Sequence, residues 1–168
     1  TCMRPSQIAP KAHIGANGIR AEFTVEFANS GSYALASLGL NIEEQKAVDR
    51  FRQSVVEPSM TNLVILDFWA EWCGPCKALT PVLEKVAAEY ADKGVILAKI
   101  NVDEERFIAD QFQIRSIPTG YAMFQGQPVA DLTAARGESQ LKAMLDQLLA
   151  KLPIEAGGTP PQDVTPLL

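Results

Sequence analysis

The sequence LVILDFWAEWCGPCK, residues 63–77, determines the architecture of this chain. It begins with an apolar run rich in β-branched and aromatic residues, which predicts a strand covered on both faces within a mixed or parallel sheet. Two cysteines, Cys73 and Cys76, follow after a short turn. Apolar residues then recur at helical spacing, at Leu79, Leu83, Val86, Ala87 and Tyr90. We therefore expect the cysteine pair at the point where a strand hands over to a helix.

The first turn of a helix gives two cysteines a particular chemistry. Its N–H groups lack intrahelical partners and lie at the positive end of the helix dipole, which favours thiolate over thiol. Cysteines three residues apart in that turn can close a disulfide with little backbone movement. We expect Cys73 to be the exposed attacking sulfur and Cys76 the recessed one that resolves a mixed disulfide. Pro75 suits this turn, where its missing N–H is not needed.

The segment FWAEWCGPCK, residues 68–77, resembles the active-site segment of thioredoxins, whose Cys-x-x-Cys pair is redox active. A second segment agrees with this resemblance. Ile117-Pro118-Thr119 follows Cys76 by some 42 residues, with a predicted strand and helix in between. In thioredoxins the proline of the matching Ile-Pro-Thr is cis and packs against the cysteines, so the resemblance implies the same for Pro118.

A Cys-x-x-Cys pair is also half of a zinc site, which needs two further Cys or His ligands. Only Cys2 and His13 remain, both in an N-terminal segment without helical or strand periodicity. We therefore expect no metal, and no cofactor other than a redox-active disulfide between Cys73 and Cys76.

The residues before the apolar run predict one helix and an N-terminal extension. Residues 1–40 show no periodic pattern, and we expect them to be disordered. Asn41 followed by Glu44 is typical of a helix N-cap with a reciprocating acid, and the apolar stripe after it predicts a helix that ends near 57–58. Thioredoxins usually begin with a strand before this helix. Here that strand is faint, at best a few residues around 38–42.

The residues that follow the helix predicted after Cys76 also fit the order of elements in thioredoxins. They predict a buried strand at 95–101, a short helix at 105–112, a hairpin of 121–124 with 129–133, and a last helix carrying the leucines 141–152. Residues 153–168 have the composition of a Pro/Gly-rich linker or tail. The resemblance thus covers residues 41–152 and implies an α/β thioredoxin fold, a central mixed β-sheet flanked by α-helices.

Composition and charge exclude several classes of function. A formal net charge of −5 argues against nucleic acid or an anionic membrane as partner. No apolar stretch approaches membrane-spanning length, and no apolar segment of a secretory signal is present. Three cysteines do not make a disulfide scaffold. We therefore expect a cytoplasmic protein.

The resemblance also implies roles for individual residues. Asp67 lies inside the apolar run, where an ion without a partner costs several kcal/mol. The implied role is proton acceptor for Cys76 in the resolving step, with a pKa raised by burial; the alternative is a structural carboxylate satisfied by hydrogen bonds. Lys99 matches the lysine that neighbours this acid in thioredoxins. The implied substrate groove consists of Trp72, Gly74, Pro75, Ile117, Pro118 and Thr119.

Two classes of function follow from the resemblance. The first is a protein-disulfide reductase that acts on protein disulfides and is recycled by a flavoenzyme of the thioredoxin-reductase type. The second is a binding module, because the segments 56–60 and 125–129 are similar to bacterial thioredoxin-like co-chaperones. In those proteins tetratricopeptide repeats follow the thioredoxin domain, and the partners would then include chaperone clients. This chain would correspond to the N-terminal domain of such a protein.

Two positions depart from the thioredoxin pattern. Gly120 stands where thioredoxins have an aliphatic residue, and Ala134 stands where they have a glycine beside the substrate groove. Glycine inside a strand often marks a close backbone approach. Both departures predict an altered range of substrates and leave the thiol chemistry intact.

Overall fold

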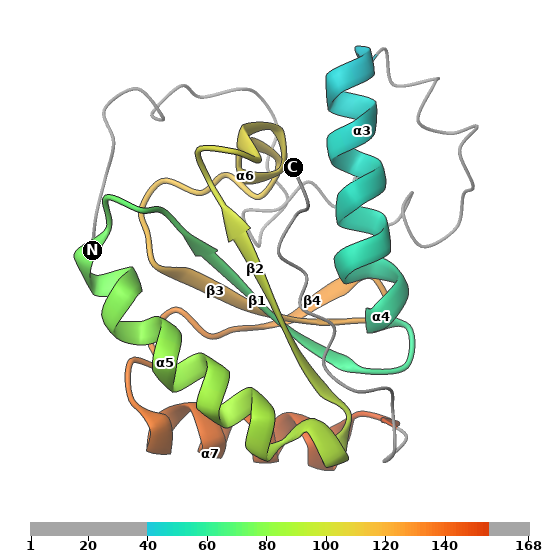
Figure 1. Ribbon diagram of the computed structural model, residues 1–168. Helices are drawn as coiled ribbons and strands as arrows, with labels where there is room; N and C mark the ends of the chain where they lie inside the picture. The colour runs from blue at the N-terminus through green and yellow to red at the C-terminus, as the bar shows by residue number, and fades with distance from the viewer. Residues whose placement is uncertain (1–39, 155–168) are drawn as a thin grey trace.

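A computed structural model describes residues 40–154 of the chain. Its centre is one sheet of four strands in the order β2-β1-β3-β4 (Figure 1). The first two, β1 (Leu63–Trp69) and β2 (Val95–Asn101), are parallel. The other two, β3 (Thr119–Phe124) and β4 (Gln127–Asp131), are antiparallel to their neighbours. The predicted mixed sheet is confirmed.

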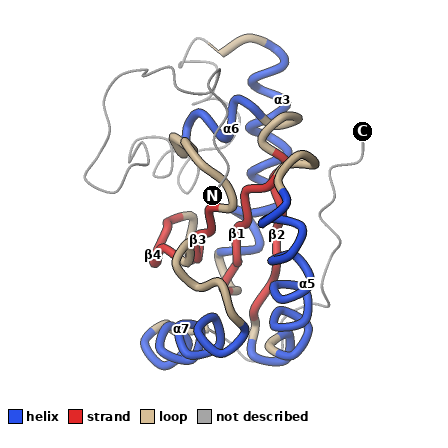
Figure 2. Tube along the Cα trace, turned by 90° about the vertical axis from the view of Figure 1, so that its left-hand side faces the viewer, coloured by secondary structure: helices blue, strands red, loops and turns tan. Residues whose placement is uncertain are grey.

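Helices cover both faces of this sheet. One layer contains α3 (Ile42–Phe51) and α6 (Arg106–Gln111); the other contains α5 (Gly74–Glu89) and α7 (Glu138–Lys151). Figure 2 shows the strands between these two layers, with α3 and α6 on one side and α5 and α7 on the other. A short 3₁₀ turn, η3 (Ala91–Lys93), follows α5 and ends at Gly94, whose φ of 79° is left-handed. The α/β fold with a sheet flanked by helices is confirmed.

Strand β1 is buried because both helix layers pack against it. Val64, Leu66 and Phe68 belong to the apolar cluster beneath α3 and α6. Leu63 and Ile65 belong to the cluster beneath α5 and α7. Since side chains alternate along a strand, Asp67 lies on the α5 and α7 face. The apolar run therefore carries one carboxylate into the interior of the domain.

The capping box at the start of α3 is confirmed. The Asn41 side chain accepts the N–H of Glu44, and the Glu44 carboxylate accepts the N–H of Asn41, both at 2.9 Å. No strand occupies residues 40–42, because Leu40 and Asn41 lead directly into the helix; the rest of the faint strand expected at 38–42 lies outside the described residues.

The first helical run ends at Ser59, within two residues of the predicted end near 57–58, but it is not a single α-helix. The chain continues through a π-helical segment, η2 (Arg52–Val56), into α4 (Glu57–Ser59). Pro58 does not end the run, because it lies in the first turn of α4, where its missing N–H is not needed. The other boundaries differ by a few residues. Strand β4 begins at Gln127 rather than 129, because Gln127 and Pro128 already pair with β3.

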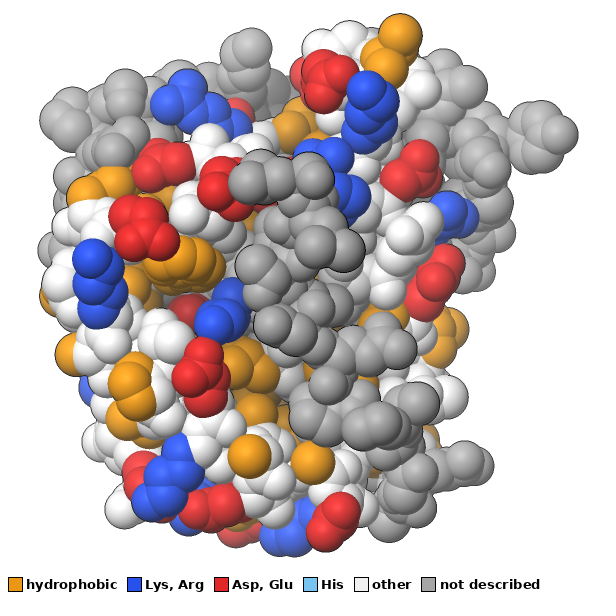
Figure 3. Space-filling model, in the orientation of Figure 1, with side chains coloured by type: hydrophobic (Ala, Val, Ile, Leu, Met, Phe, Trp, Pro, Cys, Tyr) orange, Lys and Arg blue, Asp and Glu red, His pale blue; other side chains and the backbone are white. Residues whose placement is uncertain are grey.

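Ion pairs join the two helices of the α5 and α7 layer. Lys85 of α5 pairs with Glu138 of α7 at 2.8 Å, and Glu138 also pairs with Lys142 at 2.7 Å. Figure 3 shows charged side chains of both signs interspersed at the lower edge of the molecule, where these helices lie. Exposed pairs of this kind contribute little stability singly, so the apolar contacts beneath them hold the layer in place.

Most of the predicted extension (1–40) and tail (153–168) lies outside the described residues. Between residues 40 and 154, none of the helices has both the length and the apolar character that crossing a membrane requires.

Candidate active site

A disulfide joins Cys73 to Cys76, with their Cα atoms 5.3 Å apart. Cys73 is the N-cap of α5, and its Sγ accepts the backbone N–H of Cys76 at 3.2 Å. Pro75 lies in the first turn of the same helix. The cysteine pair therefore lies between the end of β1 and the start of α5, as predicted. The Cys73 sulfur acts as the hydrogen-bond acceptor that caps the helix N-terminus.

The two sulfurs are equally buried in this disulfide form. Cys73 is 0% exposed and Cys76 is 1% exposed, so the expectation of an exposed Cys73 is wrong here. The physical reason is that the Cys73 sulfur turns into the helix cap, and both cysteines join the apolar cluster against which Trp72 packs. Exposure therefore does not distinguish attacking from resolving sulfur, and the distinction depends on their places in α5.

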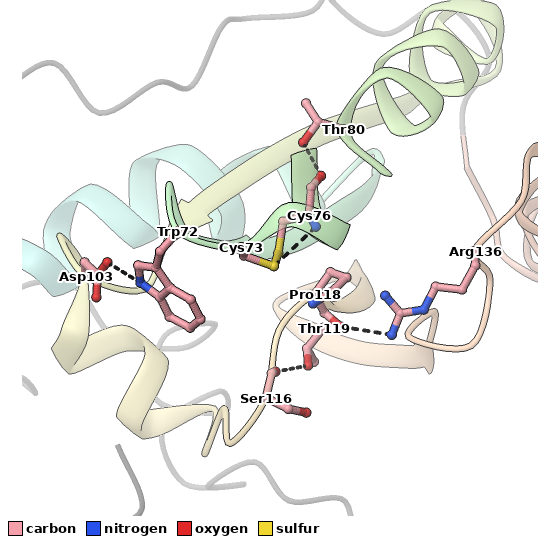
Figure 4. Close-up of a disulfide and its surroundings, with 9 residues drawn as sticks. All are labelled: Trp72, Cys73, Cys76, Thr80, Asp103, Ser116, Pro118, Thr119 and Arg136. Atoms are coloured by element: carbon pink, nitrogen blue, oxygen red, sulfur yellow. Dashed lines mark hydrogen bonds between the residues drawn. A yellow bond between two sulfur atoms is a disulfide. The ribbon is translucent and has the colours of Figure 1, made fainter. Parts of the chain in front are cut away.

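The residues predicted to form the substrate groove lie around this disulfide. The Ile117–Pro118 peptide bond is cis, and Figure 4 shows the Pro118 ring facing the disulfide. On one side Trp72 donates from Nε1 to Asp103 at 2.8 Å. Thr119 donates from its hydroxyl to the carbonyl of Ser116 at 2.6 Å. The structure thus brings the segments around 72–76 and 117–119 together; Gly74 and Pro75 are exposed, and Ile117 is buried.

Asp67 is almost fully buried on the α5 and α7 face of β1, with 2% of its surface exposed. Burial raises the pKa of its carboxyl from the ordinary 3.8 to about 7, and the positive charges of Lys99 and Arg136 oppose that rise. Both cations act through charge and neither makes a hydrogen bond to the carboxyl. The carboxyl therefore changes its protonation state near neutral pH.

Lys99 lies beside Asp67 in the register of β1 and β2, as the resemblance implied. Its ammonium, however, pairs with Glu84 of α5 at 2.8 Å. A carboxylate at this distance shares the positive charge, so Lys99 offsets the charge of Asp67 only in part. Nothing in the local spacing of the sequence links positions 84 and 99.

Arg136 is the neighbour that the sequence did not reveal. It belongs to the loop before α7, and its Nη2 donates to the carbonyl of Pro118 at 3.4 Å. Figure 4 shows it on the side of the disulfide opposite Trp72. An arginine before a helix is ordinary in a sequence, and only the folded chain shows that it reaches the active site.

The residues from 40 to 154 contain no group of three or more His, Cys, Asp or Glu side chains placed to hold a metal ion. Cys2 and His13, the two further ligands considered for zinc, lie outside that range.

Comparison with known proteins identifies the family. The thioredoxin family model matches residues 43–147. A thioredoxin of Acidithiobacillus ferridurans is 44% identical over 101 residues, which are 60% of this chain and 91% of the relative. A thioredoxin of Alicyclobacillus acidocaldarius subsp. acidocaldarius is 48% identical over 86 residues, 51% of this chain and 81% of the relative. Thioredoxin 1 of Synechococcus elongatus is 41% identical over 99 residues, 59% of this chain and 90% of the relative.

The family match spans the disulfide, Asp67 and the Ile-Pro-Thr segment together. Members of this family act through their own cysteine pair, and here that pair forms a disulfide at the start of a helix. The chain therefore belongs to the thioredoxin family and is a thiol–disulfide oxidoreductase.

Proposed function

We propose that this protein reduces disulfide bonds of protein substrates, with Cys73 attacking and Cys76 resolving. The observation that supports this best is the position of Cys73 as the N-cap of α5. In the reduced form its sulfur would accept the same N–H and lie at the positive end of the helix dipole, which favours the thiolate. Cys76 lies one turn further into the helix, where this stabilisation is weaker.

The reaction has two exchange steps. The Cys73 thiolate attacks one sulfur of the substrate disulfide, a mixed disulfide forms, and the first substrate thiolate leaves. Cys76 then gives its proton to Asp67 and attacks the Cys73 sulfur, and the second substrate thiolate leaves. Two electrons pass from the dithiol to the substrate, and the protein retains the Cys73–Cys76 disulfide. A flavoenzyme of the thioredoxin-reductase type would return two electrons to it.

The proton acceptor in this scheme is Asp67. A carboxyl whose pKa is about 7 is nearly matched to a thiol, so proton transfer between them is close to balanced at neutral pH. The competing interpretation, a structural carboxylate held by hydrogen bonds, has less support, because Lys99 and Arg136 influence the carboxyl through charge alone.

The substrate groove of this proposal is formed by Trp72, Gly74, Pro75, Ile117, Pro118 and Thr119. Ala134, which replaces the glycine of other thioredoxins, is exposed and adds a methyl group near this surface. We expect it to favour substrates whose backbone does not press closely on that loop.

Separate cysteine substitutions test the assignment. Cys73→Ala should abolish reduction of a model protein disulfide, because no thiolate remains to attack. Cys76→Ser should accumulate a mixed disulfide through Cys73, visible by intact mass. Cys2→Ser is the control and should behave like the parent protein. Faster alkylation of Cys76 than of Cys73 in the reduced protein at neutral pH would reverse the roles.

We further propose that this domain belongs to a cytoplasmic bacterial co-chaperone and contributes to cell redox homeostasis. The segments 56–60 and 125–129, which carry that similarity, lie in contact. The N–H of Gln125 donates to the Ser59 carbonyl at 2.6 Å, and the N–H of Gly126 donates to the Ser59 hydroxyl at 2.9 Å. The two parts of the similarity are therefore adjacent in the fold. The cytoplasm keeps thiols reduced, as a disulfide reductase requires.

In this second proposal residues 41–152 form the thioredoxin-like domain, and the family match to 43–147 supports those limits. Two measurements test it. The coding sequence downstream of Leu168 should continue into helical repeats of about 34 residues. The Cys73→Ala/Cys76→Ser double variant should still suppress aggregation of a denatured client protein. Loss of suppression with the cysteines would show that thiol chemistry, and not client binding, is the activity.

A further inference from the structure

Gly120 of β3 lies directly opposite Asp67 of β1, and Lys99 of β2 lies on the other side of Asp67. Residues opposite each other on neighbouring strands project from the same face of a sheet. A side chain at position 120 would therefore project from the same face as Asp67, into the space bounded by Leu132 and the Leu66 carbonyl. Glycine leaves that space without a side chain of its own.

A small cavity of about 10 Å³ occupies this place, close to the room that one water molecule needs. Asp67, Gly120, Thr133, Pro118 and Arg136 all line it, together with apolar side chains from β1, α5 and the loop before α7. The cavity therefore extends from the buried carboxyl towards the surface between β3 and the start of α7.

Arg136 is the exposed member of that lining, so its guanidinium lies at the opening of the cavity. The hydrogen bond from its Nη2 to the Pro118 carbonyl holds it there (Figure 4). Lys99, the other cation near Asp67, shares its charge with Glu84. Arg136 differs from Lys99 in this respect, because no carboxylate within residues 40–154 lies within ion-pair distance of it.

The other ionisable groups around Asp67 come from each element packed against it. Strand β2 contributes Lys99, whose ammonium pairs with Glu84 of helix α5, and the loop before α7 contributes Arg136. Strand β3 contributes no ionisable group opposite Asp67, because Gly120 stands there.

We propose that Gly120 and Arg136 are positioning residues for the resolving step. Gly120 leaves room to hydrate the Asp67 carboxylate, and Arg136 stabilises its negative charge from the opening of the cavity. The inference rests on the proposed role of Asp67 as proton acceptor. Burial raises the pKa of this carboxyl to about 7 even though the positive charges of Lys99 and Arg136 oppose the rise, so with less hydration or without a nearby cation the carboxyl would be mostly protonated at neutral pH and could not accept a proton.

Direct titration of the Asp67 carboxyl tests this without relying on activity. The ¹³C NMR signal of the carboxyl carbon in the oxidised protein, assigned by its loss in Asp67→Asn, gives the midpoint pH of this titration. Gly120→Ala and Gly120→Val should raise the midpoint, because they exclude water from the cavity. Arg136→Gln should raise it by about half a pH unit or more, because it removes a positive charge. Arg136→Lys should restore most of the original value.

The variants are chosen so that folding does not obscure the result. A Cβ at Gly120 would meet Leu132 Cβ and the Leu66 carbonyl at 3.6 Å, which is ordinary contact, so the alanine variant fits without strain. Arg115→Gln removes an exposed arginine that does not line the cavity, and it should leave the midpoint unchanged.

The inference and the function on which it rests fail in different ways. An unchanged midpoint in both Gly120→Val and Arg136→Gln would overturn the inference, even if Asp67→Asn slows turnover. Normal turnover of Asp67→Asn would overturn the role of Asp67 as proton acceptor, even if the midpoints move as expected.

Discussion

Replacing Asp67 by asparagine should raise the free energy of unfolding and, at the same time, slow the reduction of substrate disulfides. Asparagine has nearly the same shape and no charge, so it removes the cost of holding an ion in the interior. The same change removes the proton acceptor that we assign to Cys76, so the resolving step should slow.

The magnitude follows from the pKa of the buried carboxyl. Folding raises this pKa from 3.8 to about 7, so the folded protein binds the proton more tightly than the unfolded chain does. At about 1.4 kcal/mol per pKa unit, the difference corresponds to about 4 kcal/mol. The contribution of Asp67 to the stability of the parent protein should therefore be most favourable below the unfolded pKa, become less favourable as the pH rises towards 7, and level off above it. The asparagine variant lacks this loss.

Urea unfolding of the oxidised parent and of Asp67→Asn between pH 4.5 and 8.5 measures the effect. The advantage of the variant should grow with pH and approach about 4 kcal/mol at the alkaline end. Asp92→Asn is the matched control, because Asp92 is an exposed carboxylate, and its curve should run parallel to that of the parent. Rates of disulfide reduction by the parent and by Asp67→Asn over the same pH range test the predicted slowing of the resolving step.

Two results would refute this reasoning. Parallel stability curves for parent and Asp67→Asn would mean that the carboxyl is as well solvated in the folded state as in the unfolded chain. A less stable variant at neutral pH with normal turnover would mean that the carboxylate is a structural anchor. In that case the mechanism assigned to Asp67 is wrong.

Three further predictions concern other parts of the domain. Arg50→Gln should lower the free energy of unfolding by about 1–3 kcal/mol, because the arginine pairs at 2.7 Å with the Glu105 carboxylate, which is only 7% exposed and would be left without its cation; a loss below about 0.5 kcal/mol in urea unfolding would contradict it. Ser59→Ala should cost a similar ~1–3 kcal/mol in the same assay, because it leaves a buried N–H of the β3–β4 turn without its acceptor; no change would mean that water replaces the hydroxyl. Peptide mapping after oxidation should find Cys73 bonded to Cys76, with Cys2 outside the pair, and a dominant product containing Cys2 would be the contrary outcome.

Sequence reasoning succeeded where local chemistry decides the structure. The run LVILDFW predicted a strand covered on both faces, because β-branched and aromatic residues without polar alternation suit that environment, and helices do cover both faces of β1. The capping box at Asn41 is equally local and was also predicted. The cis peptide bond before Pro118 came from the resemblance to thioredoxins and is confirmed.

Features that depend on distant contacts were missed or misplaced. The π-helical segment after α3 was invisible, because Val55 and Val56 are adjacent and apolar and so fit the stripe of either helix type. The burial of Cys73 depends on the closed helix cap and on the cluster around it. The contact from Arg136 to Pro118 joins a loop to a strand end, and its geometry is set by the packing of α7.

The unusual protonation of Asp67 is a consequence of sheet register more than of its immediate sequence. A shift of β1 by one residue would turn Asp67 to the α3 and α6 face, away from Lys99, Gly120 and the cavity. Leu63 and Ile65 prevent that shift, because both would have to leave the cluster beneath α5 and α7. The apolar residues that stabilise β1 therefore also impose the cost of the buried carboxylate. The gain from their burial allows the domain to keep, beside its disulfide, an acid that titrates near neutral pH.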